Sequence, residues 1–142
     1  MTVKQLSVFV ENKQGMLKDI VNSISSSNVN IRAMSIADTK DYGILRLIVS
    51  DIQAAKMALT DDCLSSVNDV IAVGLDDKAG SLADILNILS EKGIDIDYLY
   101  AFTAHTNNGA YVVLRVADTK AAEAVLAEKN VPMLSEDDLK NI

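Results

Sequence analysis

The chain contains an internal repeat. The stretch ENKQGMLKDI at residues 11–20 returns as DDKAGSLADI at residues 76–85. Further identities follow 65 residues apart, and then 67 residues apart after a two-residue insertion. The matched pairs are Lys13/Lys78, Gly15/Gly80, Leu17/Leu82, Asp19/Asp84, Ile20/Ile85, Asn22/Asn87, Ser25/Ser90, Ile31/Ile96, Leu47/Leu114, Val49/Val116, Asp51/Asp118, Ala54/Ala121, Ala55/Ala122 and Leu59/Leu126. Because the order of matches is preserved, the chain is expected to be a duplicated unit, with one domain at residues 1–66 and a second at residues 67–142. No Pro-rich or Gly-rich linker separates the copies, so we expect a continuous extended segment at the boundary.

Each copy predicts the same series of elements. Apolar residues alternate at residues 6–10 and again at residues 71–75, which predicts strands with one buried face. Helical spacing follows each glycine, and Asn28 and Gly93 are suited to end these helices. Two strands, a short helix capped by Asp51 or Asp118, and a last strand complete each copy. The fold class is therefore α+β: two tandem ferredoxin-like βαββαβ units, with antiparallel sheets and both helices on one face.

The length and charge of the chain restrict its partners. Within 142 residues each plait is very small, so side-by-side pairing and a homodimer through the open sheet face, including Phe9, are expected. The net charge of −7 opposes nucleic acid and anionic membranes as partners. The N-terminal residues show no apolar signal or spanning segment, which favours a cytoplasmic protein. Cys63 is the only cysteine, so no internal disulfide can form.

The sequence gives little sign of catalysis. His105, the only histidine, falls in a predicted hairpin tip without cysteine or a second histidine, so we expect no metal and no other cofactor. Ser81 and Ser35 fall elsewhere in the predicted fold, which argues against a serine, histidine and aspartate triad. No phosphate-binding glycine motif is present. Tyr98 and Tyr100 share one strand face and are interpreted as core or interface residues. The chain is therefore not expected to be an enzyme.

The repeated loop resembles that of the ACT domain, a small regulatory module that binds amino acids. The resemblance rests on the order strand, acidic or amide residues, Gly, Leu and Asp-Ile on a helix, then Asn-Ile or Asp-Ile at the next strand. It covers the whole chain as two tandem modules. The family often has Pro before the Gly, whereas Gln14 and Ala79 stand there in this chain. The resemblance implies that a ligand sits where this loop meets the second strand of a neighbouring module.

The physics of the loop is consistent with an amino-acid ligand. The first backbone N–H groups of a helix lack internal partners and lie at its positive end, so they suit a carboxylate. The ligand's ammonium group needs acceptors such as Asn12, Asp76 or Asp77. The candidate ligand-binding residues are Asn12, Gln14, Gly15, Met16, Leu17, Asn30 and Ile31 in the first copy, and Asp77, Ala79, Gly80, Ser81, Leu82 and Ile96 in the second. Neutral Asn12, Gln14 and Asn30 favour the first copy slightly over the second.

Two other interpretations stay open. The glycines can serve only to turn the chain from strand to helix, while Asp19 and Asp84 are ordinary solvated helix residues. The chain would then be an interaction protein or regulatory subunit whose ligand site has decayed. In the interpretation we prefer, it senses a free amino acid and passes the signal through dimer packing or to a separate metabolic enzyme or regulator. The identity of the amino acid and the number of filled sites do not follow from the sequence.

Overall fold

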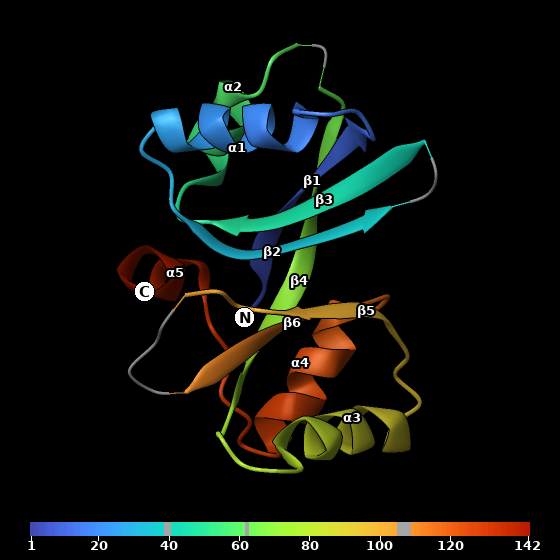
Figure 1. The fold of residues 1–142 in the computed structure, drawn as a ribbon. Helices are drawn as coiled ribbons and strands as arrows, with labels where there is room; N and C mark the ends of the chain where they lie inside the picture. Colours follow the sequence, from blue (N-terminus) through green and yellow to red (C-terminus); the bar gives the residue numbers. More distant parts are fainter. Residues whose placement is uncertain (39–40, 62, 105–108) are drawn as a thin grey trace. The chain divides into compact units, whose positions relative to one another are not determined.

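The computed structural model describes residues 1–38, 41–61, 63–104 and 109–142. These residues form two compact units (Figure 1). The first unit is Lys4–Asn68, and the second unit is Asp69–Ile142 together with Met1–Val3. The expected domain boundary after residue 66 stays a prediction, because compactness alone does not show that a segment folds independently.

The first unit has the predicted order of elements. They are β1 (Val3–Glu11), α1 (Met16–Ser26), β2 (Ile31–Asp38), β3 (Tyr42–Val49), α2 (Ile52–Ala58) and the start of β4 (Ser65–Leu75). The strands lie in the order β2-β3-β1-β4. β3 pairs antiparallel with both β1 and β2, and the Phe9 amide donates to the Leu64 carbonyl at 2.9 Å. Figure 1 shows α1 and α2 together on one face of this sheet.

The second unit repeats that arrangement. It continues from β4 through α3 (Ser81–Glu91), β5 (Ile96–Ala101), β6 (Ala110–Val116) and α4 (Thr119–Glu128), with strand order β4-β6-β5. Residues 131–134 add a short ladder to β4: the Gly74 amide donates to Pro132 O at 2.8 Å, and the Leu134 amide donates to Ala72 O at 2.9 Å. The predicted tandem ferredoxin-like fold is confirmed.

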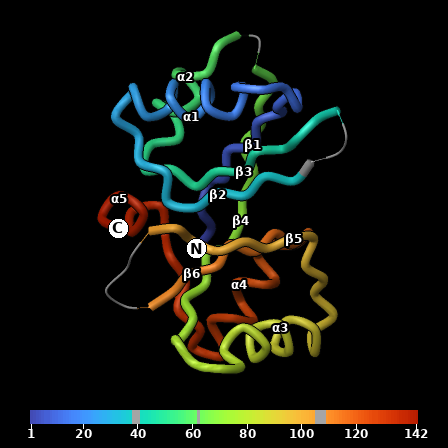
Figure 2. Tube along the Cα trace, viewed as in Figure 1, coloured from blue at the N-terminus to red at the C-terminus, as the bar shows by residue number. Residues whose placement is uncertain are grey.

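β4 supplies the last strand of the first unit and the first strand of the second. It runs without interruption from Ser65 to Leu75 (Figure 2). This confirms the prediction that a continuous extended segment joins the copies.

Each unit has its own hydrophobic core between sheet and helices. Leu6, Val8 and Val10 of β1 alternate with Ser7 and Phe9, which places the first three on the helix-covered face. Phe9 points to the opposite face and is 47% exposed, as expected. The buried cluster of the first unit is Leu6, Val8, Val10, Ile20, Ile24, Val29, Leu45, Leu47, Val49 and Ala55. The matching cluster of the second unit is Ile71, Val73, Ile85, Leu89, Val112, Leu114, Val116, Ala122 and Leu126.

Local sequence signals set the helix ends. Asn28 and Gly93 follow the C-caps of α1 and α3 with φ of 58° and 69°, the left-handed conformation that ends a helix. Asp51 and Asp118 begin α2 and α4, and each side chain accepts a hydrogen bond at 3.0 Å from the amide three residues later. These predictions are confirmed.

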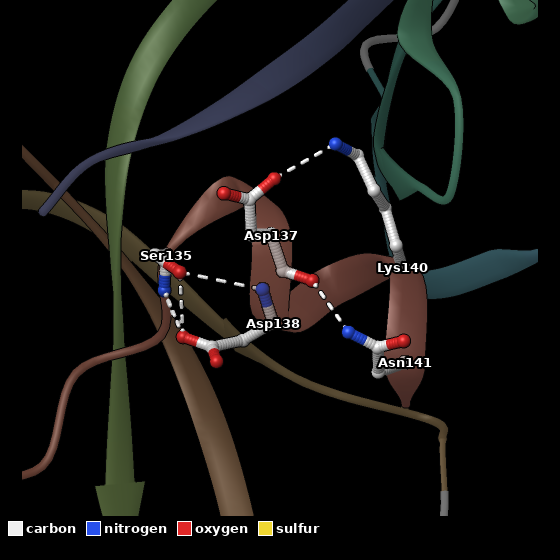
Figure 3. Close-up of polar contacts among 5 residues, drawn as sticks. All are labelled: Ser135, Asp137, Asp138, Lys140 and Asn141. Atoms are coloured by element: carbon white, nitrogen blue, oxygen red, sulfur yellow. Dashed lines mark hydrogen bonds and ion pairs between the residues drawn. The ribbon is translucent and has the colours of Figure 1, made fainter.

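The C-terminal helix α5 (Glu136–Asn141) was not predicted. Its start is a capping box: the Asp138 amide donates to Ser135 Oγ at 3.3 Å, and the Ser135 amide donates to Asp138 Oδ2 at 2.7 Å (Figure 3). Lys140 Nζ lies 2.8 Å from Asp137 Oδ1. The Ser-x-x-Asp spacing at residues 135–138 was the sequence signal that could have revealed this helix.

The predicted turn between β5 and β6 falls mostly outside the described residues. His105 and Asn108 belong to the undescribed part, so the expectations for them stay untested. Gly109 has φ of 109°, and a Cβ at this residue would lie 2.8 Å from the Leu75 carbonyl oxygen. Glycine is therefore required there by both conformation and space.

Candidate functional site

The two repeated loops have the same backbone geometry. Gly15 has φ 87° and ψ −12°, and Gly80 has φ 94° and ψ −14°. Each is followed directly by a helix, whose fourth residue donates its amide to the glycine carbonyl at 2.9 Å. The other shared bonds are Lys13 N to Glu11 O and Lys78 N to Asp76 O, both 2.8 Å, and Met16 N to Lys13 O and Ser81 N to Lys78 O, both 3.3 Å. The repeat in sequence is therefore a repeat in structure at the level of single hydrogen bonds.

Each glycine is required by conformation and not by space. Positive φ favours glycine because a Cβ would crowd the backbone in the left-handed region. A Cβ placed on Gly15 or Gly80 nevertheless meets no described atom within 4 Å. The loop is thus open in front of the glycine, where an approaching molecule would reach the start of the helix.

Helices α1 and α3 differ from the other helices in how they begin. In the described part of the chain, no side chain caps either of them. By contrast, Asp51, Asp118 and Ser135 cap α2, α4 and α5. The unpaired amides at a helix start attract negative charge. Among the described helices, α1 and α3 are the two whose first amides donate no hydrogen bond to a capping side chain.

Each loop also contains an ion pair of its own. Lys13 Nζ lies 2.6 Å from Glu11 Oε2, and Lys78 Nζ lies 2.9 Å from Asp76 Oδ2. The hydrogen bond from each lysine to its carboxylate, followed by charge attraction, raises the pKa of both lysines. Both lysines are exposed, so the pairs add little to stability. Each pair balances the charge of the lysine in its loop.

The candidate residues of the first loop divide into exposed polar and half-buried apolar groups. Asn12 and Gln14 are exposed, and the Asn12 amide donates to the Asp41 carbonyl at 3.0 Å. Met16 and Leu17 are half-buried and pack against the core of the first unit. The structure therefore brings Asn12, Gln14, Gly15, Met16 and Leu17 together at one end of the sheet.

The second loop has a matching division. Asp77 and Ala79 are exposed, Leu82 is half-buried and packs against the core, and Gly80 lies between them. Ser81 occupies the place of Met16 and is also half-buried. Its Oγ atom is buried without a hydrogen-bond partner among the described residues. A polar group thus replaces the first loop's apolar side chain at the first helical position.

The structure does not bring the second-strand residues to the loop of the same unit. Ile31 faces Val49 across β2 and β3, whereas Glu11 faces Tyr42. Seven residue steps along β3, from Tyr42 to Val49, separate these two levels, about 23 Å at the usual rise of a strand. Asn30 and Ile31 thus lie at the far end of the sheet from the first loop. Ile96, which faces Val116 in β6, is likewise distant from the second loop, since Leu75 faces Ala110.

Sequence reasoning missed a hollow beside the second loop. Its volume is about 530 Å³, and it is lined by the end of β4, the first turns of α3, Tyr111 and residues 129–132. Lys129, Asn130, Val131 and Pro132 were not candidates, because nothing in the repeat points to the segment after α4. The first unit has a smaller hollow of about 210 Å³, lined by α1 and by Leu59, Thr60 and Cys63.

No cation site or spanning helix is found in the described ranges. No group of three or more histidine, cysteine or carboxylate side chains there is placed to hold a metal ion. Within the same residues, no helix is both long and apolar enough to cross a membrane.

Comparison with known proteins identifies the family. The family model of the ACT domain pair matches residues 1–142. The chain belongs to the ACT domain pair family. Protein BT0572 from Bacteroides thetaiotaomicron is similar over 100% of this chain and 98% of its own, with 38% identity and a TM-score of 0.91. No curated protein matches the chain.

Two regulatory subunits share the fold of this ACT domain pair at low sequence identity. The regulatory subunit of aspartate kinase from Thermus thermophilus, in a ligand-free form, has a TM-score of 0.63 and 14% identity, with 87% of each chain covered. The corresponding subunit from Thermus flavus has a TM-score of 0.58 and 12% identity, covering 89% of this chain and 90% of that one. At these identities the similarity shows a shared fold.

Proposed function

We propose that this ACT domain pair is a regulatory protein that binds a free amino acid and has no catalytic step of its own. The observation that carries the proposal is the contrast among helix starts. α1 and α3 begin at open glycine turns without a side-chain cap among the described residues, whereas α2, α4 and α5 are capped. Membership of the family and the fold shared with regulatory subunits of aspartate kinase support the same function.

The proposed binding mode uses complementary charges. The ligand carboxylate accepts hydrogen bonds from amides later in the first helical turn, because the Met16 and Ser81 amides already donate to the Lys13 and Lys78 carbonyls. Its ammonium group lies toward Asn12 in the first loop or Asp77 in the second, since these exposed oxygens are acceptors. Half-buried Met16 and Leu17 supply an apolar wall in the first loop.

The second strand of a neighbouring module completes the proposed site. Asn30 and Ile31, or Ile96, cannot reach the loop of their own unit, since they lie at the other end of the sheet. We therefore assign them to a site made with the loop of another module, in the same chain or in a second copy. A ligand that bridges the two favours one packing of modules over another, which is how binding would become a signal.

The output is proposed to pass through a homodimer or to a separate metabolic enzyme or regulator. Phe9 supports a contact with another copy, because it is 47% exposed although Gln5 and Ser7 on the same face of β1 are buried. A cytoplasmic location, where free amino acids are abundant, belongs to the same proposal. The alternative is a regulatory interaction protein with a decayed ligand site, which Gln14 and Ala79 in place of the family's proline favour.

A thermal-shift screen of the purified chain against all twenty amino acids, each at millimolar concentration, tests the proposal. A ligand at about 100 times its Kd stabilises the folded protein by roughly 2.7 kcal/mol, which raises the melting temperature by on the order of 10 °C.

Gly15→Asn and Gly80→Asn form a matched pair of variants, because asparagine tolerates positive φ and places a side chain before the helix amides. We expect at least one to lose the shift. A flat panel, together with a protein captured specifically by the chain, would support the decayed-site alternative instead.

A further inference from the structure

The hollow beside the second loop is formed within one unit. It is lined by α3, by residues 129–132, by the end of β4 and by Tyr111. The segment after α4 is fixed against β4, because the Gly74 amide donates to Pro132 O at 2.8 Å. A Cβ on Gly74 would lie 3.2 Å from Pro132 Cβ and 3.3 Å from Tyr111 Cε1, so these side chains close tightly over the strand. The hollow is thus bounded by packed structure and not only by loops.

A buried hydroxyl without a partner lies in the wall of this hollow. Ser81 Oγ is shielded and makes no hydrogen bond to a described residue. Buried polar atoms are nearly always paired, because an unmade hydrogen bond is costly. Rotation about one side-chain bond would turn the hydroxyl toward a molecule in the hollow. The first unit has Met16 at the equivalent position, which carries no such group.

The charges of the wall are balanced and separated. Asp76 and Lys78 form an ion pair with each other. The other two charged groups are Asp84, which stands in the first turn of α3 and also attracts Lys78, and Lys129, which stands after α4. The wall therefore offers an anion and a cation from two different elements, which suits a molecule that carries both charges. The smaller hollow of the first unit contains Asp19 but no lysine or arginine.

We propose that this hollow is a second ligand site, lined by the second unit alone, that holds a small zwitterion of the amino-acid class. The ammonium group of the ligand lies toward Asp84, its carboxylate lies toward Lys129, and Ser81 donates to one of its oxygens. Its volume of about 530 Å³ is sufficient for a free amino acid. The ligand class rests on the proposed function, but the site needs no second strand from a neighbouring module.

Amide chemical shifts of the full chain, titrated with each of the twenty amino acids, test this site. We expect one or more to move the amides of Ile85, Ile88 and Val131. Lys129→Gln should weaken that binding about tenfold or more, because it removes a charge-assisted bond. Lys120→Gln on α4 is the matched control, since Lys120 is exposed and outside the hollow. It should leave the affinity unchanged.

A second variant separates a ligand role from a structural one. Ser81→Ala removes an unpaired hydroxyl, so the melting temperature of the free protein should stay level or rise while the affinity for the amino acid falls. A melting temperature that falls without a change in affinity would make Ser81 merely structural and would overturn its assignment.

The pattern of shifts distinguishes this site from the proposed loop site. Shifts confined to residues 12–17, 30–31, 77–80 and 96, with none at Ile88 or Val131, would overturn the hollow and leave the proposed function standing. Shifts at Ile88 and Val131 that Lys129→Gln weakens, with none at residues 30–31 or 96, would support the hollow and remove the module-bridging mode. No shift with any of the twenty amino acids would overturn both.

Discussion

The two repeated loops have the same backbone but different surroundings. Gly15 and Gly80 differ by only a few degrees in φ, and the hydrogen bonds around them match in length. Their neighbours differ: Met16 packs on a core, whereas its equivalent Ser81 has an unpaired hydroxyl beside a hollow more than twice as large. The backbone of such a turn is thus set by glycine and hydrogen bonds, while the chemistry available to a ligand is set by the next side chain.

The largest expected effect is on the two cores. Leu47 and Leu114 are equivalent residues of the repeat, and both are fully buried. Replacing either by alanine leaves a cavity, so Leu47→Ala and Leu114→Ala should each lower the free energy of unfolding by about 3 kcal/mol. Urea denaturation of the two variants would measure this. A cost below about 1 kcal/mol for either one would show that its unit relaxes around the cavity.

The next effect concerns the glycine turns. Gly15→Ala and Gly80→Ala should each cost about 1 to 2 kcal/mol, because alanine is strained at positive φ. Since neither Cβ meets an atom within 4 Å, the two costs should be equal within error. Thermal unfolding of both variants tests this, with Gly15→Asn as a milder control. Unequal costs would mean that the loops differ in backbone strain and not only in their neighbours.

The smallest expected effect concerns the capping box of α5, a feature that α1 and α3 lack. The side-chain hydrogen bond from Ser135, followed by the one from its amide, lowers the pKa of Asp138 below 3.8. Because the folded pKa is depressed, the stabilisation is present above the unfolded value and is lost as the pH falls through the folded value. An NMR titration of the Asp138 carboxyl should give a midpoint below 3.8, and Ser135→Ala should raise it. An unchanged midpoint in the variant would exclude Ser135 as the cause.

The fold was predictable because the two repeats show the same pattern of apolar residues, caps and glycines. Alternation in β1 and β4, the caps Asp51 and Asp118, and the left-handed Asn28 each depend on local chemistry that the sequence displays. Helix α5 was missed because six residues carry too little periodicity, although its capping box was visible.

The candidate site was predictable only in part. The loop residues follow one another in sequence, so a motif identifies them together. Lys129 and Pro132 reach the second loop only because residues 131–134 pair with β4, which is a long-range contact. The unpaired state of Ser81 Oγ also depends on packing, which periodicity does not encode.

The uncapped starts of α1 and α3 have a consequence for stability. A capping side chain commonly contributes about 1 kcal/mol, and this chain uses such caps on its other described helices. Twice, in copies that diverged at most other positions, the stabilising residue is missing and the bare turn persists. Filling both turns with capping side chains would therefore be expected to raise the free energy of unfolding by an amount that the other described helices already gain.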